Sequence, residues 1–268
     1  MTPLAVMTIG GSDSSAGAGV QADLKVFAAM RLYGASVATS VTAQNTRGVH
    51  DVFELPGNVV AAQLSAVLDD MPIAAVKVGM LATAEAAAAV TAKARAGLLP
   101  NLVIDPVLES AAGRRRGVVS AIERLLPFAK VATPNREEAS ALVGWAVSTP
   151  ADMAGAAAQI ASNGPTYVVV TGGDMVAGEE AVDAVWTDAG ARFLRYPRVQ
   201  TRNSLGTGCT FSAAIAGRLA LGDVVPDALV YAKEYVARSL IGARDWKLGG
   251  GRGPLNHFDW PTFASFPA

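Results

Sequence analysis

The chain has 268 residues, 51% of them hydrophobic, a single cysteine, and 22 Lys+Arg against 23 Asp+Glu, which gives a net charge of −1. The length fits one domain with a large apolar core, and the balanced charge argues against nucleic acid or an acidic membrane surface as the partner, which leaves a small molecule as the expected ligand. The lone cysteine excludes an internal disulfide and a cysteine-rich zinc site, and neither a signal-peptide pattern nor a membrane-spanning apolar run is present, so we expect a cytoplasmic protein without membrane contacts.

Apolar runs of strand length alternate with amphipathic, alanine-rich segments along the chain. The expected strands are 4–9, 35–42, 73–79, 101–107, 130–133 and 166–173, and the clearest intervening helices are 58–70 and 83–97. Such alternation predicts an α/β protein with a mostly parallel sheet covered by helices on both faces. Residues 180–197 predict a hairpin at the antiparallel edge of this sheet, and two helices, 206–222 and 226–243, follow. No repeat, linker or composition shift divides the chain, so we expect a single domain, 1–268.

The loop after the first expected strand reads "GGSDSSAGAGVQADL", residues 10–24. Its glycines allow the backbone to approach a ligand closely, and a helix that begins near Gly19 offers free N–H groups. The spacing matches neither the G-x-G-x-x-G fingerprint nor a P-loop. A plain flexible turn is therefore as good an interpretation as a binding site.

The segment "TAQNTRGVH", residues 42–50, places Gln44 where the second strand ends. A glutamine amide donates and accepts side by side, which matches the amino group and ring nitrogen of an aminopyrimidine. The competing interpretation is an ordinary exposed glutamine, and His50 is expected to be a surface histidine.

Two further loops, "DPVLES" and "TPNREEAS", place acidic and amide groups just beyond strand ends. Asp105 can hold a cation or its water, and Asn135 and Glu138 share one face of a starting helix, directed at the same cleft. Asn135 and Glu138 also have the spacing of a capping box, which is compatible with metal binding.

The segment "NSLGTGCTFSAAIAG" contains the only cysteine where a glycine turn becomes a helix. Gly206, Thr207 and Gly208 can present backbone N–H groups to a phosphoryl group in transfer. Cys209 lies in the first turn of the helix, where we expect a lowered thiol pKa and a thiolate able to act as a base. The alternative is a small cysteine that only packs the helix.

Several motifs stand in a fixed order along nearly the whole chain: "TIGGSDSSAGAGVQADLKVF", "TAQNT", "VKVGML", "DPV", "TPNREEA", "TGG", "GTGCTFSAAIA", "AKEYV" and "GPLNHF". Together they resemble the hydroxymethylpyrimidine/phosphomethylpyrimidine kinases, thiamine-pathway members of the ribokinase-like superfamily. The resemblance implies a ribokinase-like three-layer α/β/α fold, ATP with Mg²⁺, and a homodimer. It also implies phosphorylation of 4-amino-5-hydroxymethyl-2-methylpyrimidine and then of its monophosphate.

By the same resemblance, individual residues receive roles. Cys209 takes the place of the aspartate base of related sugar kinases, and Lys233 approaches the transferred phosphate. The residues expected around the pyrimidine are Gly11, Asp23, Gln44, Met80 and Val107. Those expected at the nucleotide are Asn135, Thr171 and Gly173, and those expected at Mg²⁺ are Asp105 and Glu138.

The chain departs from the family pattern at the phosphate side. Leu205 stands where members usually have histidine, and Thr171 stands where they have lysine. Arg114, Arg115 and Arg116 can restore positive charge there, although a triple-arginine loop is more often simply solvated. Two alternatives to the pyrimidine kinase therefore stay open: a pyridoxal kinase of the same fold, and a catalytically weak paralogue that binds the pyrimidine.

Overall fold

The computed structural model describes residues 2–108, 115–173, 175 and 178–258. Its strands are β1 (Ala5–Asp13), β2 (Tyr33–Asn45), β3 (Gly48–Glu54), β4 (Ile73–Val78), β5 (Val103–Ile104), β6 (Val131–Ala132), β7 (Tyr167–Val170), β8 (Glu180–Thr187) and β9 (Gly190–Pro197). Its helices are α1 (Gly19–Ala29), α2 (Gly57–Leu68), α3 (Ala84–Arg95), α4 (Arg115–Leu125), α5 (Arg136–Val143), α6 (Pro150–Ala161), α7 (Thr207–Ala220) and α8 (Val225–Ala243). None of these helices is long and apolar enough to cross a membrane.

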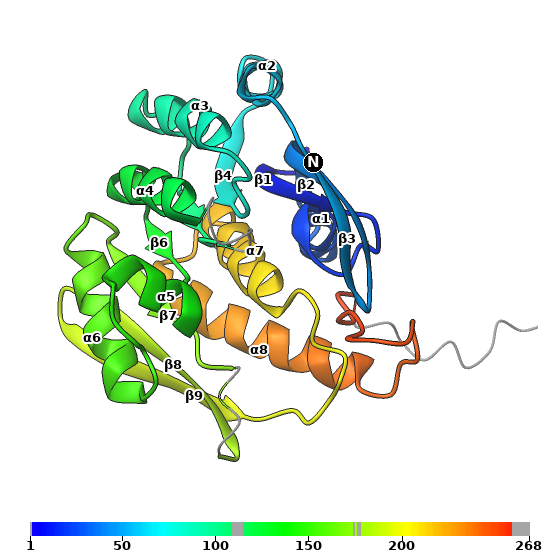
Figure 1. The fold of residues 1–268 in the computed structure, drawn as a ribbon, viewed down its shortest axis with the longest axis vertical. Coiled ribbons are helices and arrows are strands. Elements are labelled where there is room, and N and C mark those ends of the chain that lie inside the picture. The colour runs from blue at the N-terminus through cyan, green and yellow to red at the C-terminus, as the bar shows by residue number, and fades with distance from the viewer. Residues whose placement is uncertain (1, 109–114, 174, 176–177, 259–268) are drawn as a thin grey trace, which may run out of the picture.

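The strands form one sheet in the order β3-β2-β1-β4-β5-β6-β7-β8-β9. The strands from β2 to β7 in this order run parallel, whereas β3 pairs antiparallel with β2, and β8 and β9 form the antiparallel hairpin at the other edge. Helices cover both faces (Figure 1). The mostly parallel, three-layer arrangement and its antiparallel edge are as expected from the alternating pattern.

Each face of the sheet has its own apolar core. One core packs α2 to α6 against the sheet through residues such as Leu64, Val90 and Ile122. The other packs α1, α7 and α8 through residues such as Phe27, Ile215 and Leu229. Because the central strands are covered on both faces, their sequences are nearly continuous apolar runs, as is usual for parallel sheets.

The structure corrects the expected elements near the first two strands. β1 continues to Asp13 and β2 to Asn45, so residues expected in loops belong to strands. Strand β3 was not expected at all: it is exposed along most of its length, including His50, and a strand with no buried face lacks the alternation that identifies strands. Among the three arginines, Arg114 lies outside the described residues, and α4 begins at Arg115, so the expected loop is partly helix.

The start of α7 depends on glycine at one position. Gly206 has a φ of 87°, and a Cβ there would lie 2.0 Å from the carbonyl oxygen of Gly17. We expect Gly206→Ala to lower the free energy of unfolding by at least about 2 kcal/mol, because it adds backbone strain to a steric overlap. In the control Gly208→Ala, the new Cβ would meet only the Asp105 oxygens at 3.9 Å, and alanine favours the helix by about 1 kcal/mol. Urea denaturation of both variants measures the difference in the free energy of unfolding. A Gly206→Ala variant as stable as the wild type would contradict the close contact between position 206 and the Gly17 carbonyl.

Candidate active site

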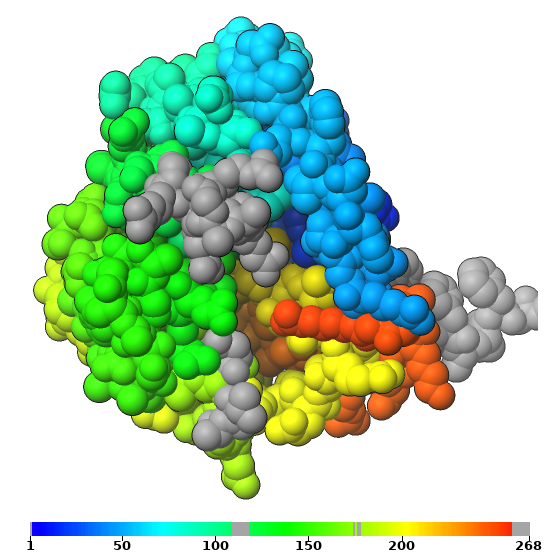
Figure 2. Space-filling model, viewed as in Figure 1, coloured from blue at the N-terminus to red at the C-terminus, as the bar shows by residue number. Residues whose placement is uncertain are grey.

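A cleft of about 260 Å³ lies at the carboxyl ends of the parallel strands. The surface is hollowed where the blue β2–β3 hairpin, the green segments and the yellow segment before α7 meet (Figure 2). The strand order places the end of β2 at one side of this cleft, β1, β4 and β5 in the middle, and β6 and β7 at the other side. The described residues that line it are 10–13, Ala18, Gly19, Thr42, Gln44, Lys77, Gly79, Met80, Asp105, Val107, Thr133, Asn135, Glu138, Thr171, 205–209 and Arg252.

The carboxylate of Asp13 holds the glycine loop between β1 and α1. It accepts hydrogen bonds from the backbone N–H groups of Ser15, Gly17 and Ala18, and from the Ser15 hydroxyl, at 2.8 to 3.0 Å. The backbone N–H of Asp13 is itself bound by the Gln21 side chain at 2.8 Å. The loop is therefore held in one shape by a buried acceptor, which argues against the plain flexible turn.

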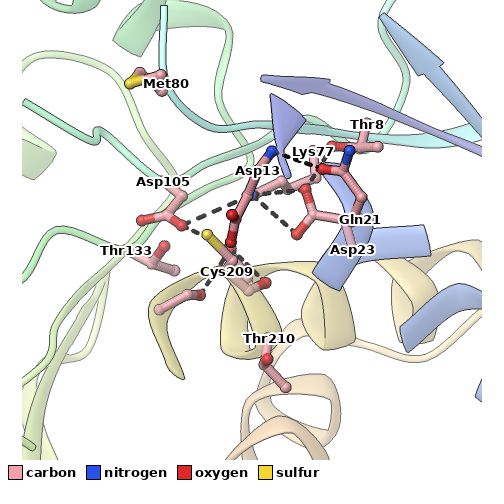
Figure 3. Close-up of polar contacts among 12 residues, drawn as sticks. Thr8, Asp13, Gln21, Asp23, Lys77, Met80, Asp105, Thr133, Cys209 and Thr210 are labelled. Atoms are coloured by element: carbon pink, nitrogen blue, oxygen red, sulfur yellow. Dashed lines mark hydrogen bonds and ion pairs between the residues drawn. The ribbon is translucent and has the colours of Figure 1, made fainter. Parts of the chain in front are cut away.

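Lys77 on β4 forms the floor of the cleft and was not among the site residues expected from the sequence. Its side chain is 1% exposed, and its ammonium lies 2.8 Å from Asp23 Oδ2 and 3.8 Å from Asp105 Oδ2 (Figure 3). Coulomb attraction from the surrounding acidic groups raises its pKa although burial acts in the opposite direction, so it stays charged. A single lysine inside the apolar run "IAAVKVG" was the available signal, because a charge in a buried strand requires a partner.

The expectation that Asp23 contacts the pyrimidine is corrected. Asp23 is fully buried beneath the cleft lining, where it accepts hydrogen bonds from the Thr8 hydroxyl at 2.6 Å and from Lys77. Both of its oxygens are thus directed at neighbouring side chains and not at the cleft. Its function in this arrangement is to position Lys77.

Asp105 follows β5 and lies near the start of α7. Its Oδ2 accepts a hydrogen bond of 3.0 Å from the Ser212 hydroxyl, and burial raises the pKa of the carboxyl although Lys77 lowers it. No described residue donates a hydrogen bond to its Oδ1, which lies 3.9 Å from where a Cβ on Gly208 would stand. Asp105 therefore offers one carboxylate oxygen near the turn at 206–208.

Cys209 lies in the first turn of α7 and lines the cleft, as expected, but its thiol is not ionised there. Burial raises the pKa of the thiol to about 12, and the Asp105 and Asp23 carboxyls act in the same direction. The Lys77 ammonium and the backbone N–H of Gly19 act against this rise without cancelling it. The expected low pKa is wrong. Desolvation of the sulfur and the two neighbouring carboxyls raise the pKa by more than the N-terminus of the helix can lower it.

Gln44 is placed by the end of β2. Its Oε1 accepts a hydrogen bond from the Thr42 hydroxyl at 3.1 Å, and its backbone N–H and carbonyl both bind the Ser14 hydroxyl at 2.8 Å. The single proton of the Thr42 hydroxyl is shared between Gln44 Oε1 and the Ser12 carbonyl, each 3.1 Å from the hydroxyl oxygen, and the Gln44 side chain lines the cleft. The side-chain amide nitrogen then remains as a donor toward a ligand.

Apolar and small residues line the same side of the cleft. Met80 and Val107 both line it, and a Cβ on Gly11 would lie 2.5 Å from the Met80 Cε. Glycine at this position therefore leaves the methionine side chain room against the strand. The expected grouping of Gly11, Gln44, Met80 and Val107 around one cavity agrees with this placement.

Asn135 and Glu138 form the capping box of α5, and both line the cleft. The Glu138 N–H binds Asn135 Oδ1 at 2.9 Å, and the Asn135 N–H binds Glu138 Oε2 at 2.8 Å. Thr171 lies beside Asn135 through a parallel bridge and lines the cleft as well. No group of three or more His, Cys, Asp or Glu residues that fits a metal is found in the described part of the chain.

Lys233 and Gly173, by contrast, are not brought to the cleft lining. The Lys233 ammonium on α8 forms an ion pair with Asp183 Oδ2 on β8, and Asp183 Oδ1 accepts a hydrogen bond of 3.0 Å from the N–H of Gly172. Lys233 thus holds the β7–β8 connection to α8, and the structure gives no support for its expected approach to the phosphate. The sequence could not show this, because the partner lies 50 residues away.

Leu205 and Arg252 complete the cleft at the turn before α7. The Leu205 N–H binds the Gly253 carbonyl at 2.9 Å, and its side chain packs where a Cβ on Gly17 would lie, 2.6 Å from Leu205 Cδ2. The position that holds a histidine in the resembled family is thus an apolar contact here. Arg252, which is not among the site residues expected from the sequence, lines the cleft from the C-terminal glycine loop.

The sequence and the fold of this chain are similar to those of known kinases. The profile of the family described as phosphomethylpyrimidine kinase matches residues 13–256. The chain belongs to this family. The hydroxymethylpyrimidine/phosphomethylpyrimidine kinase of Streptomyces coelicolor is 44% identical over 261 residues, which is 96% of this chain and 95% of that protein.

Solved structures of kinases share the fold of this family member. The pyridoxal kinase of Staphylococcus aureus, in complex with AMP-PCP and pyridoxal, is similar with a TM-score of 0.88 and 34% identity, covering 96% of this chain and 94% of that one. The phosphomethylpyrimidine kinase of Clostridium difficile is similar with a TM-score of 0.75 and 34% identity, covering 88% and 99%. The ribokinase-like fold expected from the sequence is thereby confirmed.

The raised pKa of Cys209 predicts slow alkylation. With a pKa of about 12, we expect iodoacetamide to modify the protein at pH 7.5 at least about 10²-fold more slowly than a free thiol, with a rate that still rises at pH 10. Because the chain has one cysteine, intact-protein mass spectrometry reports this site directly. A plateau in the rate below pH 9 would show that the thiol ionises far more readily than its burial requires.

Proposed function

We propose that this chain is an ATP-dependent kinase that phosphorylates 4-amino-5-hydroxymethyl-2-methylpyrimidine and then its monophosphate, in thiamine biosynthesis. The observation that carries the proposal is the order of groups along one cleft. Gln44 lies at the β2 side, Cys209 and the turn at 206–208 lie in the middle, and Thr171 lies at the β7 side. This order provides an aminopyrimidine site, a reaction centre and a nucleotide side in sequence.

In the first step the pyrimidine hydroxyl is the nucleophile. Its oxygen attacks the γ-phosphorus of ATP and its proton passes to the Cys209 sulfur, while the bond from the γ-phosphorus to the β,γ-bridging oxygen breaks and ADP leaves. The proton acceptor is the thiolate form of Cys209. Because burial raises the pKa of the thiol to about 12, this form is a minor one at neutral pH, and the Lys77 ammonium stabilises it. The N–H groups of residues 206–208 are placed to stabilise the charge on the phosphoryl group in transfer.

Mg²⁺ is the metal that fits the oxygen groups of the cleft. Among the described residues none donates a hydrogen bond to Asp105 Oδ1, and Glu138 lines the same cleft, so the available ligands are the carboxylates that Mg²⁺ prefers. Bound there together with the nucleotide, the ion would neutralise phosphate charge. Asn135 and Thr171 are proposed to contact the nucleotide on the same side.

We also propose that the chain is a single domain that forms a homodimer in the cytoplasm. One continuous sheet runs through the described residues, which supports the single domain. The edge strand β3 and its neighbour expose the apolar side chains of Val41, Val49, Val52 and Phe53. An exposed apolar edge of this kind is usually covered by another chain.

A pyridoxal kinase is the alternative, because the pyridoxal kinase of Staphylococcus aureus shares this fold with a TM-score of 0.88. A coupled ADP-release assay with the pyrimidine and pyridoxal side by side tests both functions. The proposal requires a higher kcat/KM with the pyrimidine, and a higher kcat/KM with pyridoxal would replace it with the alternative. Turnover of neither substrate, with binding of the pyrimidine, would identify a weak paralogue.

Gln44 is expected to determine recognition of the pyrimidine. Gln44→Leu leaves the aminopyrimidine edge without its partner, which weakens binding by roughly 1–3 kcal/mol per orphaned group. ATP binding should change little, because Gln44 lies at the other side of the cleft. Isothermal titration calorimetry with each ligand measures both effects, and an unchanged pyrimidine affinity would remove Gln44 from the site.

Cys209 is expected to act as the base of the first step. Cys209→Ala should lower kcat with the hydroxymethyl substrate by about 10²–10³-fold, because a positioned base contributes about 10²–10⁴-fold. Substrate binding should stay near wild type, and Cys209→Asp should recover part of the rate by restoring an acceptor. Steady-state kinetics decide the matter: a wild-type kcat in the alanine variant would mean that the thiol only packs the helix.

A further inference from the structure

We propose that Arg252 is the residue that binds the phosphate of the monophosphorylated pyrimidine, and so makes the second phosphorylation possible. The inference rests on the proposed function, since it concerns the second substrate of the same cleft. It assigns a phosphomonoester subsite at the rim between Gln44 and the turn before α7.

The C-terminal glycine loop places Arg252 at the substrate side. The backbone N–H of Arg252 binds the Thr46 carbonyl at 2.7 Å, and the Gly251 N–H binds the Thr46 hydroxyl at 3.1 Å. Thr46 lies in the turn of the β2–β3 hairpin, two residues after Gln44. In Figure 2 the orange-red segment lies between the blue hairpin and the yellow segment before α7. Arg252 is therefore fixed beside the pyrimidine side of the cleft.

The guanidinium of Arg252 is oriented but not neutralised. Its Nε donates to the Ser204 hydroxyl and its Nη2 to the Ser204 carbonyl, both at 2.8 Å. Both acceptors are neutral, and no carboxylate in the described ranges forms an ion pair with Arg252. The side chain is thus held in one direction while its Nη1 donors and its full positive charge remain for an anion.

Other cations in the described part of the cleft do not serve this purpose. Arg252 and Lys77 are the two cationic side chains on the described lining. Lys77 is buried in its ion pair with Asp23, and Lys233 is paired with Asp183 away from the lining. A phosphomonoester carries close to two negative charges at neutral pH, so its binding requires a cation that Arg252 can supply.

The two steps differ in what they require from the protein. In the second step an ionised phosphate oxygen of the substrate attacks the γ-phosphorus, a new P–O–P linkage forms, and the bond to the leaving ADP breaks. No hydroxyl proton has to be removed, so the Cys209 base is not required. Arg252 should matter chiefly for the second step, whereas Cys209 should matter chiefly for the first.

The test compares kcat/KM for the two substrates in matched variants. We expect Arg252→Gln to lower the ratio of second-step to first-step kcat/KM by roughly 10–100-fold, as for loss of a hydrogen bond to a charged group. Arg252→Lys should retain part of the ratio of second-step to first-step kcat/KM, because lysine keeps the positive charge but lacks the paired donors of the guanidinium. Cys209→Ala should change the ratio in the opposite direction. The charge-matched control is Arg202→Gln, an exposed arginine near Ser204 that does not line the cleft.

Calorimetry with the pyrimidine monophosphate gives a second readout that needs no turnover. We expect weaker binding to Arg252→Gln, by roughly 10-fold or more, and unchanged binding to Arg202→Gln. Equal losses on both substrates would show that Arg252 only supports the Ser204 loop, and an unchanged ratio with unchanged monophosphate affinity would place the phosphate elsewhere. A wild-type protein inactive with the hydroxymethyl substrate would contradict the proposed function, and the calorimetric comparison would still decide the subsite.

Discussion

The buried ammonium group of Lys77 is the interaction on which the arrangement of the cleft depends. It joins β4 to α1 through Asp23 and to the end of β5 through Asp105, and Thr8 and Ser212 complete the hydrogen bonding of these carboxyls. Removing one partner of such a pair typically destabilises a protein by about 3–5 kcal/mol, because the other charge stays buried. The strand ends, the glycine loop and the start of α7 are thereby held at fixed distances from one another.

This network also explains how charge is distributed in the cleft. Two carboxyls and the Cys209 thiol share one ammonium, so the floor has no positive charge left for phosphate groups. Positive charge and donors are found instead at the rim, in Arg252 and in the N–H groups at 206–208. In the described lining the acidic groups therefore lie at the floor and the donors at the rim, an arrangement into which a hard cation would fit between an anionic ligand and the carboxylates.

The sequence predicted the sheet and many of the residues that line the cleft, because both follow from local pattern. Gln44 lies near the end of β2 and Cys209 in the first turn of α7 after a glycine turn, and in both cases a single segment of sequence indicates a ligand site. Lys77 and Asp23 were missed or misassigned because their roles depend on a contact between residues 54 apart. The expected low pKa of Cys209 was wrong for a similar reason, because the burial and the neighbouring carboxyls that raise it depend on the fold as a whole. Strand β3 was not predicted because neither of its faces is buried, so its sequence lacks the alternation of apolar and polar residues that identifies a strand.

The contact between the glycine loop and the hairpin turn has a consequence for synthesis of the protein. Thr46 and Gly251 are separated by 205 residues, so the β2–β3 hairpin acquires this support only after residue 251 has been synthesised and has left the ribosome. Since contacts of such high sequence separation form late and slowly, the part of the cleft beside this hairpin is expected to be completed late in folding. Truncated chains that end before the glycine loop would keep an intact sheet but would lack this contact between the loop and the hairpin turn.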